Sequence, residues 1–218
     1  MLKVDIVIMA QVPKEHYEKN YDDLNRFISY FYQIDLVKRL NVKTILEIGI
    51  GNKTVSNYLK HSGFNVTTCD FDKSLKPDYV ADIRKLPLKD NSYDLVMACE
   101  ILEHLPWEEA DAALKEMQRV TKMYAVISLP YPGITFEAAL KFPLLRRFSR
   151  KSLFNLFIRI PLFFKTIKFN GEHYWEIGVK NYPISKVRKL IKKRFRILKE
   201  VRPVLNPYNH FFLIEKRL

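Results

Sequence analysis

The chain has only two cysteines among its 218 residues, too few for a disulfide framework. Cys69 and Cys99 both fall at the ends of expected strands, so we expect reduced thiols in the core and a cytoplasmic location. The N-terminal segment lacks the charged start and small-residue cleavage site of a signal peptide, which favours the same location. No group of cysteines and histidines has metal-ligand spacing, so the sequence predicts no metal site.

Long apolar runs are also lacking. The longest aromatic and aliphatic stretch, residues 153–164, contains Arg159 and Pro161 and is shorter than the ~20 residues that a membrane-spanning helix needs. Acids are outnumbered, because 24 Asp and Glu face 37 Lys and Arg, for a net charge of +13. A positive field of this size favours phosphate-bearing partners, either RNA or an anionic membrane that the protein contacts peripherally at its surface.

Glycine is scarce, yet two of the six glycines stand two residues apart after an apolar strand, residues 44–48. Gly49 and Gly51 let the backbone turn tightly and approach a ligand with no side chain between them. A helical pattern follows, so the pair lies at a strand-to-helix junction. A dinucleotide fingerprint would need a third glycine where this chain has Thr54. The pattern therefore predicts a cofactor-binding turn of another class.

The order of strand and helix patterns predicts an α/β fold. Residues 24–40 have helical spacing and are expected to pack one apolar set on the sheet: Leu24, Phe27, Ile28, Phe31, Ile34, Val37 and Leu40. Strands and helices then alternate to about residue 129, which implies a parallel sheet with helices on both faces. We expect a helix near residues 185–194 and an antiparallel hairpin at the C-terminal end. We expect residues 1–218 to form one domain, with residues 133–182 as a cap or lid inserted within it.

The order of the motifs resembles that of class I S-adenosylmethionine-dependent methyltransferases, in their small-molecule branch. Glu47-x-Gly49-x-Gly51 looks like the first motif of the family, and Asp70 matches the acid after the second strand. Residues 81–83 are similar to the adenine-contacting segment, and residues 93–105 to the fourth strand and its exit. The resemblance implies a doubly wound, Rossmann-like sheet of seven strands, mostly parallel with the last antiparallel. It also implies S-adenosyl-L-methionine as cofactor and S-adenosyl-L-homocysteine as product.

Carried over residue by residue, the resemblance implies these cofactor-binding positions: Glu47, Gly49, Gly51, Asp70, Phe71, Asp82, Ile83, Cys99 and Glu100. The family's most frequent pattern has a third glycine where this chain has Lys53, which we expect to place a long cation beside the pocket.

Methyl transfer to a hydroxyl or ring carbon is helped by a general base, and histidine titrates near neutral pH. The candidate catalytic residues are His104, just past the fourth strand, and His173, in a run of aromatic and acidic residues. Five aromatic residues are candidates for contacting the substrate: Tyr17, Tyr21, Tyr131, Tyr174 and Trp175. No Asn/Asp-Pro-Pro-Tyr motif follows the fourth strand, which disfavours an adenine or glutamine acceptor.

The insertion after the fifth strand is both basic and apolar. Residues 141–169 contain eight Lys or Arg and no acid, interleaved with phenylalanine and leucine. Such a stretch predicts a helical, basic-aromatic element that covers a small-molecule or lipid-like acceptor or contacts an anionic membrane. Two alternatives remain: an RNA methyltransferase that holds phosphates on its basic faces, and a non-catalytic, methyltransferase-like binding module.

Overall fold

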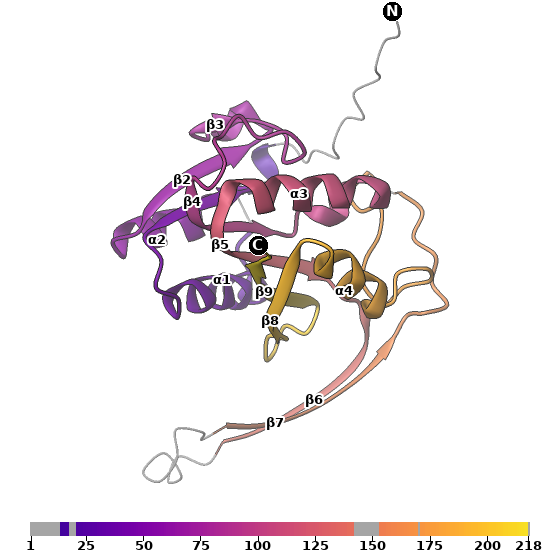
Figure 1. Cartoon of the computed structure of the whole chain (residues 1–218). Helices are drawn as coiled ribbons and strands as arrows, with labels where there is room; N and C mark the ends of the chain where they lie inside the picture. The colour runs from indigo at the N-terminus through magenta and orange to yellow at the C-terminus, as the bar shows by residue number, and fades with distance from the viewer. Residues whose placement is uncertain (1–13, 18–20, 142–152, 170, 218) are drawn as a thin grey trace, which may run out of the picture.

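The computed structural model describes residues 14–17, 21–141, 153–169 and 171–217 (Figure 1). Its main body is a seven-stranded sheet with the order β3-β2-β1-β4-β5-β9-β8, and a separate pair of strands, β6-β7, projects away from it. The sheet strands are β1 (Thr44–Ile48), β2 (Asn65–Asp70), β3 (Tyr79–Val80), β4 (Tyr93–Cys99), β5 (Thr121–Pro130), β8 (Phe195–Val201) and β9 (Asn209–Lys216). The helices are α1 (Leu24–Lys38), α2 (Thr54–His61), α3 (Ala110–Val120) and α4 (Ile184–Lys192), with short 3-10 turns η1 (Lys14–Tyr17), η2 (Lys73–Leu75), η3 (Leu102–His104) and η4 (Trp107–Glu109).

The direction of the strands confirms the predicted Rossmann-like topology. Strands β3, β2, β1, β4 and β5 pair in parallel, whereas β9 runs antiparallel to both of its neighbours, β5 and β8. Because β9 runs the other way, its first residue, Asn209, pairs with Pro130 at the end of β5. The edge at which the parallel strands end therefore also receives the start of β9 and the loop before it.

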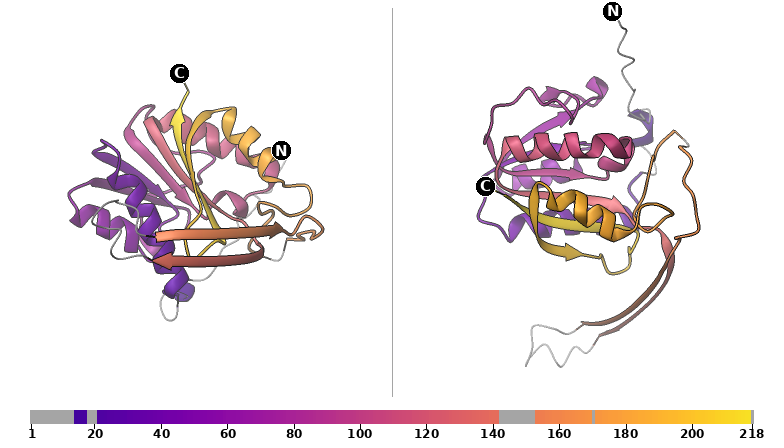
Figure 2. Two further views of the ribbon diagram at one scale, coloured as in Figure 1. Left: turned by 90° about the horizontal axis from the view of Figure 1, so that it is seen from below. Right: turned by 45° about the vertical axis from the view of Figure 1, so that its right-hand side comes forward.

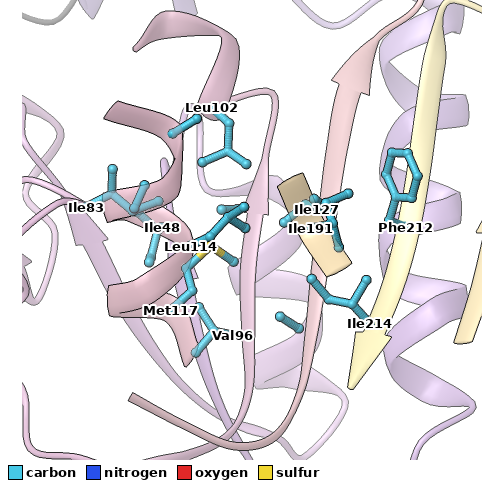
Figure 3. Close-up of a cluster of buried hydrophobic side chains, with 14 of the residues drawn as sticks. Ile48, Ile83, Val96, Leu102, Leu114, Met117, Ile127, Ile191, Phe212 and Ile214 are labelled. Carbon is cyan, nitrogen blue, oxygen red and sulfur yellow. The ribbon is translucent and has the colours of Figure 1, made fainter. Parts of the chain in front are cut away.

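Apolar side chains fill both faces of this sheet. Along β5, alternate residues point to opposite sides, so that Ile127 joins the cluster under α3 and α4 while Val126 joins the cluster under α1 and α2. Figure 3 shows Leu114 and Met117 of α3 against strand side chains of the first cluster. Because both faces are covered, β1 and β4 have buried side chains at four consecutive positions, as expected for strands of a parallel sheet.

Helix α1 packs on the sheet by only part of the predicted apolar set, its C-terminal part. Its buried side chains include Tyr30, Leu36 and Val37, whereas Leu24, Phe27 and Phe31 are more than half exposed. The helical spacing was correct, but α1 carries apolar side chains on more than one side. Only the packing of the helix on the sheet selects which of them become buried.

The prediction of a helical insertion after β5 is wrong. The structure has a β-hairpin there, β6 (Gly133–Lys141) paired antiparallel with β7 (Leu153–Pro161). The apolar residues of β7 recur at every second position, which is the period of a strand and not of a helix. Aromatic and β-branched side chains also favour strands. Residues 142–152 of the predicted insertion lie outside the described residues.

Polar contacts hold one face of the hairpin against the loop before β9. Arg202 reaches two hairpin residues, donating to the carboxylate of Glu137 at 2.8 Å and to the side-chain oxygen of Asn155 at 2.6 Å. The backbone N–H of Leu205 donates to the other oxygen of Glu137 at 2.8 Å. Figure 2 shows the hairpin extending beyond the edge of the main sheet. Among the residues that the structure describes, no helix combines the length and apolar character needed to cross a membrane.

Candidate functional site

A cavity of about 510 Å³ opens where the parallel strands end. Its walls are the turn after β1, the start of the loop after β2, and the end of β4. Two other parts of the chain complete it: the aromatic residues before α1, and a group formed by residues 172–173 with the loop before β9. Open α/β sheets bind ligands at this edge, so the cavity is the candidate site.

The glycine turn has the backbone geometry that only glycine adopts without strain. Gly49 has φ +79°, and a Cβ built on it would stand 2.0 Å from the side chain of Ile101. Its N–H donates to the carbonyl of Cys69 at 2.9 Å, which ties the turn to the end of β2. Gly51 has φ +47°, with the ring of Tyr17 at ordinary contact distance above it. Backbone at Gly49 and Gly51 thus lines the cavity.

Lys53 adopts a backbone conformation that favours glycine. Its φ of 64° lies in the left-handed region, where a side chain is strained. Lys53 stands beside the cavity, between the lining residues Asn52 and Thr54, and its amino group donates to the carbonyl of Lys76 at 2.8 Å. The turn therefore keeps its shape, and the cation of Lys53 stays outside the cofactor region.

Two buried carboxylates stand beside this turn. Asp70 accepts from the backbone N–H of Ile50 and of Asp72, each at 2.9 Å, so it fixes the glycine turn while lining the cavity. Burial raises the pKa of Asp70, and these two N–H donors oppose that rise. Glu47 is 5% exposed, and burial raises its pKa to about 7. One oxygen of Glu47, Oε2, has no hydrogen-bond partner among the described residues.

The predicted adenine segment contributes through Ile83 and not through Asp82. Ile83 and Phe71 line the cavity. The carboxylate of Asp82 instead binds the guanidinium of Arg84, with Nε at 2.9 Å, and accepts the backbone N–H of Arg84 at 2.8 Å. Asp82 is not among the described residues that line the cavity. Its pKa is lowered because those donors outweigh its desolvation by burial.

The end of β4 holds a strained backbone at the cavity wall. Glu100 has φ 55°, a conformation costly for any residue other than glycine, and it accepts the hydroxyl of Ser128 at 2.8 Å. Strain of this kind is retained where the surrounding structure requires it, commonly at functional sites. Burial raises the pKa of the Glu100 carboxyl and of the Cys99 thiol, whose side chains both face the same cavity.

The two candidate catalytic histidines meet in the wall of the cavity. The rings of His104 and His173 lie 4.9 Å apart, edge to face. His104 Nδ1 lies 2.9 Å from the carbonyl of Glu172, and His173 Nδ1 lies 2.7 Å from the carboxylate of Glu176. Burial lowers the pKa of His104, so its ring is neutral at physiological pH and able to accept a proton.

Tyr17 and Tyr21 close over the glycine turn. Their rings pack edge to face at 5.0 Å, and both contribute to the cavity wall. Burial raises the pKa of both phenols, so both are neutral. The site as a whole combines a backbone cradle, buried acids and paired imidazoles around one cavity. That arrangement is suited to holding a cofactor beside a small acceptor.

Comparison with protein families adds one decisive match. Residues 46–128, from the glycine turn to the end of β5, match a family model described as a methyltransferase domain. The chain carries an S-adenosylmethionine-dependent methyltransferase domain. The matched range contains Gly49, Gly51, Asp70 and Glu100, and it stops before the hairpin. A comparison with curated proteins returned no match.

Solved structures match nearly the whole length of the chain. A protein of Pyrococcus horikoshii is 15% identical with a TM-score of 0.59, and the match covers 93% of this chain and 94% of that one. Magnesium protoporphyrin IX methyltransferase of Synechocystis, with bound S-adenosylmethionine, is 14% identical with a TM-score of 0.58, covering 95% and 99%. The 1,6-didemethyltoxoflavin-N1-methyltransferase of Burkholderia thailandensis is 11% identical with a TM-score of 0.61, covering 94% and 83%. At these identities the likeness establishes the fold.

Three predicted substrate residues of the methyltransferase lie away from the cavity. Trp175 is fully buried in the core and donates its indole N–H to the carbonyl of Leu105 at 3.1 Å, so it is a packing residue. Tyr174 stacks on Phe169 with ring centroids 4.1 Å apart. Tyr131 lies under the guanidinium of Arg159 and lines a second, smaller cavity of about 230 Å³.

The loop before β9 supplies wall residues that the sequence analysis missed. Asn206, Tyr208 and Asn209 line the main cavity, and the hydroxyl of Tyr208 donates to Glu176 at 3.2 Å. A signal for them existed in the expected topology. A final antiparallel strand must begin at the edge where the parallel strands end, so its first residues belong to the site.

Proposed function

We propose that the chain transfers the methyl group of S-adenosylmethionine to a small-molecule or lipid-like acceptor, bound beside His104 and His173. The observation that supports this role is that one cavity is lined both by the glycine turn with Asp70 and by the two imidazoles. The reaction needs both ligands in one dry space, because an in-line displacement depends on holding nucleophile, methyl carbon and sulfur collinear.

In this proposal the cofactor lies along the ends of β1, β2 and β4. The backbone at Gly49 and Gly51 approaches its methionine moiety, and Asp70 accepts from its ribose hydroxyls. Ile83 packs against the adenine, whereas Asp82 acts through Arg84 because that guanidinium already occupies its carboxylate. Tyr17 covers the cofactor from the side of the glycine turn.

The acceptor atom attacks the methyl carbon while the carbon–sulfur bond breaks and the sulfonium becomes a neutral thioether. For a hydroxyl acceptor, one proton must leave the attacking oxygen. His104 is suited to receive it, because its ring lines the cavity and is neutral. A contact between His104 Nδ1 and the Glu172 carbonyl orients the ring.

Calorimetric titration with S-adenosylmethionine tests this role. Asp70→Asn should weaken binding about 30-fold, since replacing a buried charged acceptor costs about 2 kcal/mol. Asp78→Asn is the matched control. Asp78 also accepts two hydrogen bonds, both from Thr68 of β2, the strand that ends at Asp70, but it does not line the cavity. We expect its affinity to stay within twofold of the parent. Absence of binding by the folded parent protein would contradict the proposal.

We further propose that the methyltransferase works at an anionic membrane surface, with the hairpin as its point of contact. One face of the hairpin is apolar along its described length and open to solvent. Seven of its side chains are between 52% and 63% exposed: Ile134, Phe136, Leu140, Phe154, Leu156, Ile158 and Ile160. They pair across the two strands, as in Phe136 with Ile158, so they form one continuous strip. Exposed apolar patches of this kind mark interaction surfaces.

Charge favours a lipid partner over a second copy of the chain. Residues 141–169 contain eight cations and no acid, and the whole chain carries +13. Lys165 and Lys168 are exposed just beyond the hairpin, near the exposed rings of Phe163 and Phe164. Two copies would repel each other through these cations, whereas anionic headgroups attract them while the acyl boundary accepts the apolar strip.

Flotation of the full chain with vesicles tests the membrane contact. We expect binding to vesicles of phosphatidylcholine with phosphatidylglycerol, weaker binding to phosphatidylcholine alone, and loss of binding in Phe136→Ser/Ile158→Ser. Val80→Ser, which removes an exposed apolar side chain of β3, should bind like the parent. A dimer in sedimentation with no flotation would assign the strip to a second copy, and salt-dependent RNA binding without flotation would favour the RNA alternative.

A further inference from the structure

We infer that Glu103, His104 and His173 form a binding site for a divalent transition-metal ion at the acceptor end of the cavity. One potential ligand atom from each of these three side chains lies within 4.8 Å of the other two. Glu103 and His104 belong to η3, whereas His173 lies on a segment beyond the hairpin. Spacing along the chain therefore could not reveal the group, and it led to the expectation of no metal.

Glu103 gives an independent reason to place a cation here. Its side chain is fully buried, and neither carboxylate oxygen has a hydrogen-bond partner among the described residues. Buried polar groups are almost always paired, because leaving a carboxylate without water or a partner is costly. A metal ion bound to Glu103 supplies the missing partner, and it does so within reach of two imidazoles.

The contacts around the two histidines have the form found in metal centres. In such centres a ligating imidazole commonly donates its second N–H to a carbonyl or a carboxylate, which fixes the ring and its tautomer. Here His104 Nδ1 meets the carbonyl of Glu172 at 2.9 Å, and His173 Nδ1 meets the carboxylate of Glu176 at 2.7 Å. Tyr208 donates to the same oxygen of Glu176 at 3.2 Å and holds it in place. In this site the Nε2 atom of each ring is the ligand.

The chemistry of the three side chains selects the class of metal. Two imidazoles with one carboxylate suit zinc or ferrous iron, whereas magnesium and calcium prefer oxygen ligands. Three protein ligands leave a coordination position open, as in catalytic centres. Metal–ligand distances near 2.1 Å place tetrahedral ligands about 3.4 Å apart, so the three atoms, which lie within 4.8 Å of one another, move closer together when the metal binds. Because His104 and His173 line the cavity, the open position faces the space assigned to the acceptor.

At that position the ion would bind an acceptor oxygen and make its hydroxyl more acidic. With the metal bound, His104 is a ligand and no longer receives the proton of the acceptor. The deprotonated oxygen then attacks the methyl carbon, the carbon–sulfur bond breaks, and the proton goes to solvent. This role rests on the proposed methyl transfer and narrows the acceptor to a molecule that offers an oxygen ligand, such as a phenol. Binding of the metal does not depend on methyl transfer and is measured separately.

The test is calorimetric titration of the chelator-treated full chain with zinc chloride, together with metal analysis after dialysis. We expect one equivalent bound in the parent and affinity lowered about 100-fold in Glu103→Gln and in His173→Gln. Glu176 is not a ligand in this site but orients the ring of His173, so Glu176→Gln should lower the affinity for zinc about 10-fold. His61→Gln, at the end of α2, is the control for incidental binding by a histidine and should match the parent.

Circular dichroism and S-adenosylmethionine binding are recorded for each variant, so that misfolding is recognised. No zinc bound by the parent would overturn the inference, as would equal affinity in the parent, Glu103→Gln and His173→Gln. If the parent binds S-adenosylmethionine but not zinc, only the metal site fails. If it binds zinc but not S-adenosylmethionine, the proposed methyl transfer fails while the metal site stands.

Discussion

The half of the cavity that we propose for the cofactor, the cofactor half, comes from the ends of three adjacent parallel strands, each followed by its own motif. Gly49, Asp70 and Glu100 stand at the ends of β1, β2 and β4. The acceptor half brings His104 together with His173 and Tyr208, which lie on segments far apart in the sequence. One half is thus built by adjacent strand ends and the turns that follow them, and the other by segments far apart in the sequence. Substitutions in the acceptor half should therefore lower the stability of the fold without changing the affinity for the cofactor.

The largest effect is expected at the glycine turn. Gly49→Ala should lower the free energy of unfolding by about 3 to 4 kcal/mol, because it adds left-handed strain and pushes against Ile101. Gly63→Ala has similar strain at φ +91° but no atom within 4 Å of the new Cβ, so about 1 to 2 kcal/mol is expected. Urea denaturation measures both. Equal losses would show that the contact with Ile101 is unimportant.

Glu47 should make the stability of the cofactor half depend on pH. Burial raises its pKa from 4.5 to about 7, so the folded state resists ionisation. Below pH 4.5 the carboxyl is protonated in both the folded and the unfolded state, so it does not affect stability. Between pH 4.5 and about pH 7 it ionises more readily in the unfolded state, which lowers the free energy of unfolding by up to about 3 kcal/mol. Glu47→Gln removes that loss of stability. Thermal unfolding should therefore show the variant gaining stability over the parent at pH 8 and not at pH 4; a constant difference across this range would contradict the assignment.

At the acceptor end, Tyr208→Phe should separate the two halves. Its hydroxyl donates to the buried Glu176, so its loss should destabilise the fold by about 1.5 kcal/mol. Affinity for S-adenosylmethionine should stay within twofold of the parent, because Tyr208 belongs to the acceptor half. Tyr58→Phe, on the exposed side of α2, is the control for removal of a phenol. A large loss of cofactor affinity in Tyr208→Phe would show that the halves are coupled.

The smallest effect is expected at Lys53, where the substitution should increase stability. Lys53→Gly should raise stability by about 0.5 to 1 kcal/mol, because the relief of left-handed strain exceeds the added entropy of the unfolded chain. Lys60→Gly, inside α2, should have the opposite sign by about 1 kcal/mol, since glycine is unfavourable within a helix. Chemical denaturation of the pair measures the difference. Destabilisation by both changes would mean that the hydrogen bond from Lys53 to Lys76 outweighs the strain.

Several predictions from the sequence hold because they depend on neighbours in the chain. The strand before Gly49 and the antiparallel last strand follow from apolar runs and short connections. The insertion was predicted as a helix from its density of phenylalanines, although alternate residues of β7, such as Phe154 and Ile158, carry the period of a strand. Composition does not decide between helix and strand; spacing and the partner strand do.

The sequence by itself determined the sheet, the glycine turn and the acid at the end of β2, because each is set by residues within one strand and the turn that follows it. Only the tertiary structure decided which face of α1 is buried, that Trp175 packs in the core, and that Glu103 and His104 meet His173. Those outcomes depend on contacts between segments distant in sequence. Such contacts become available only when the sheet forms and brings the segments to one edge.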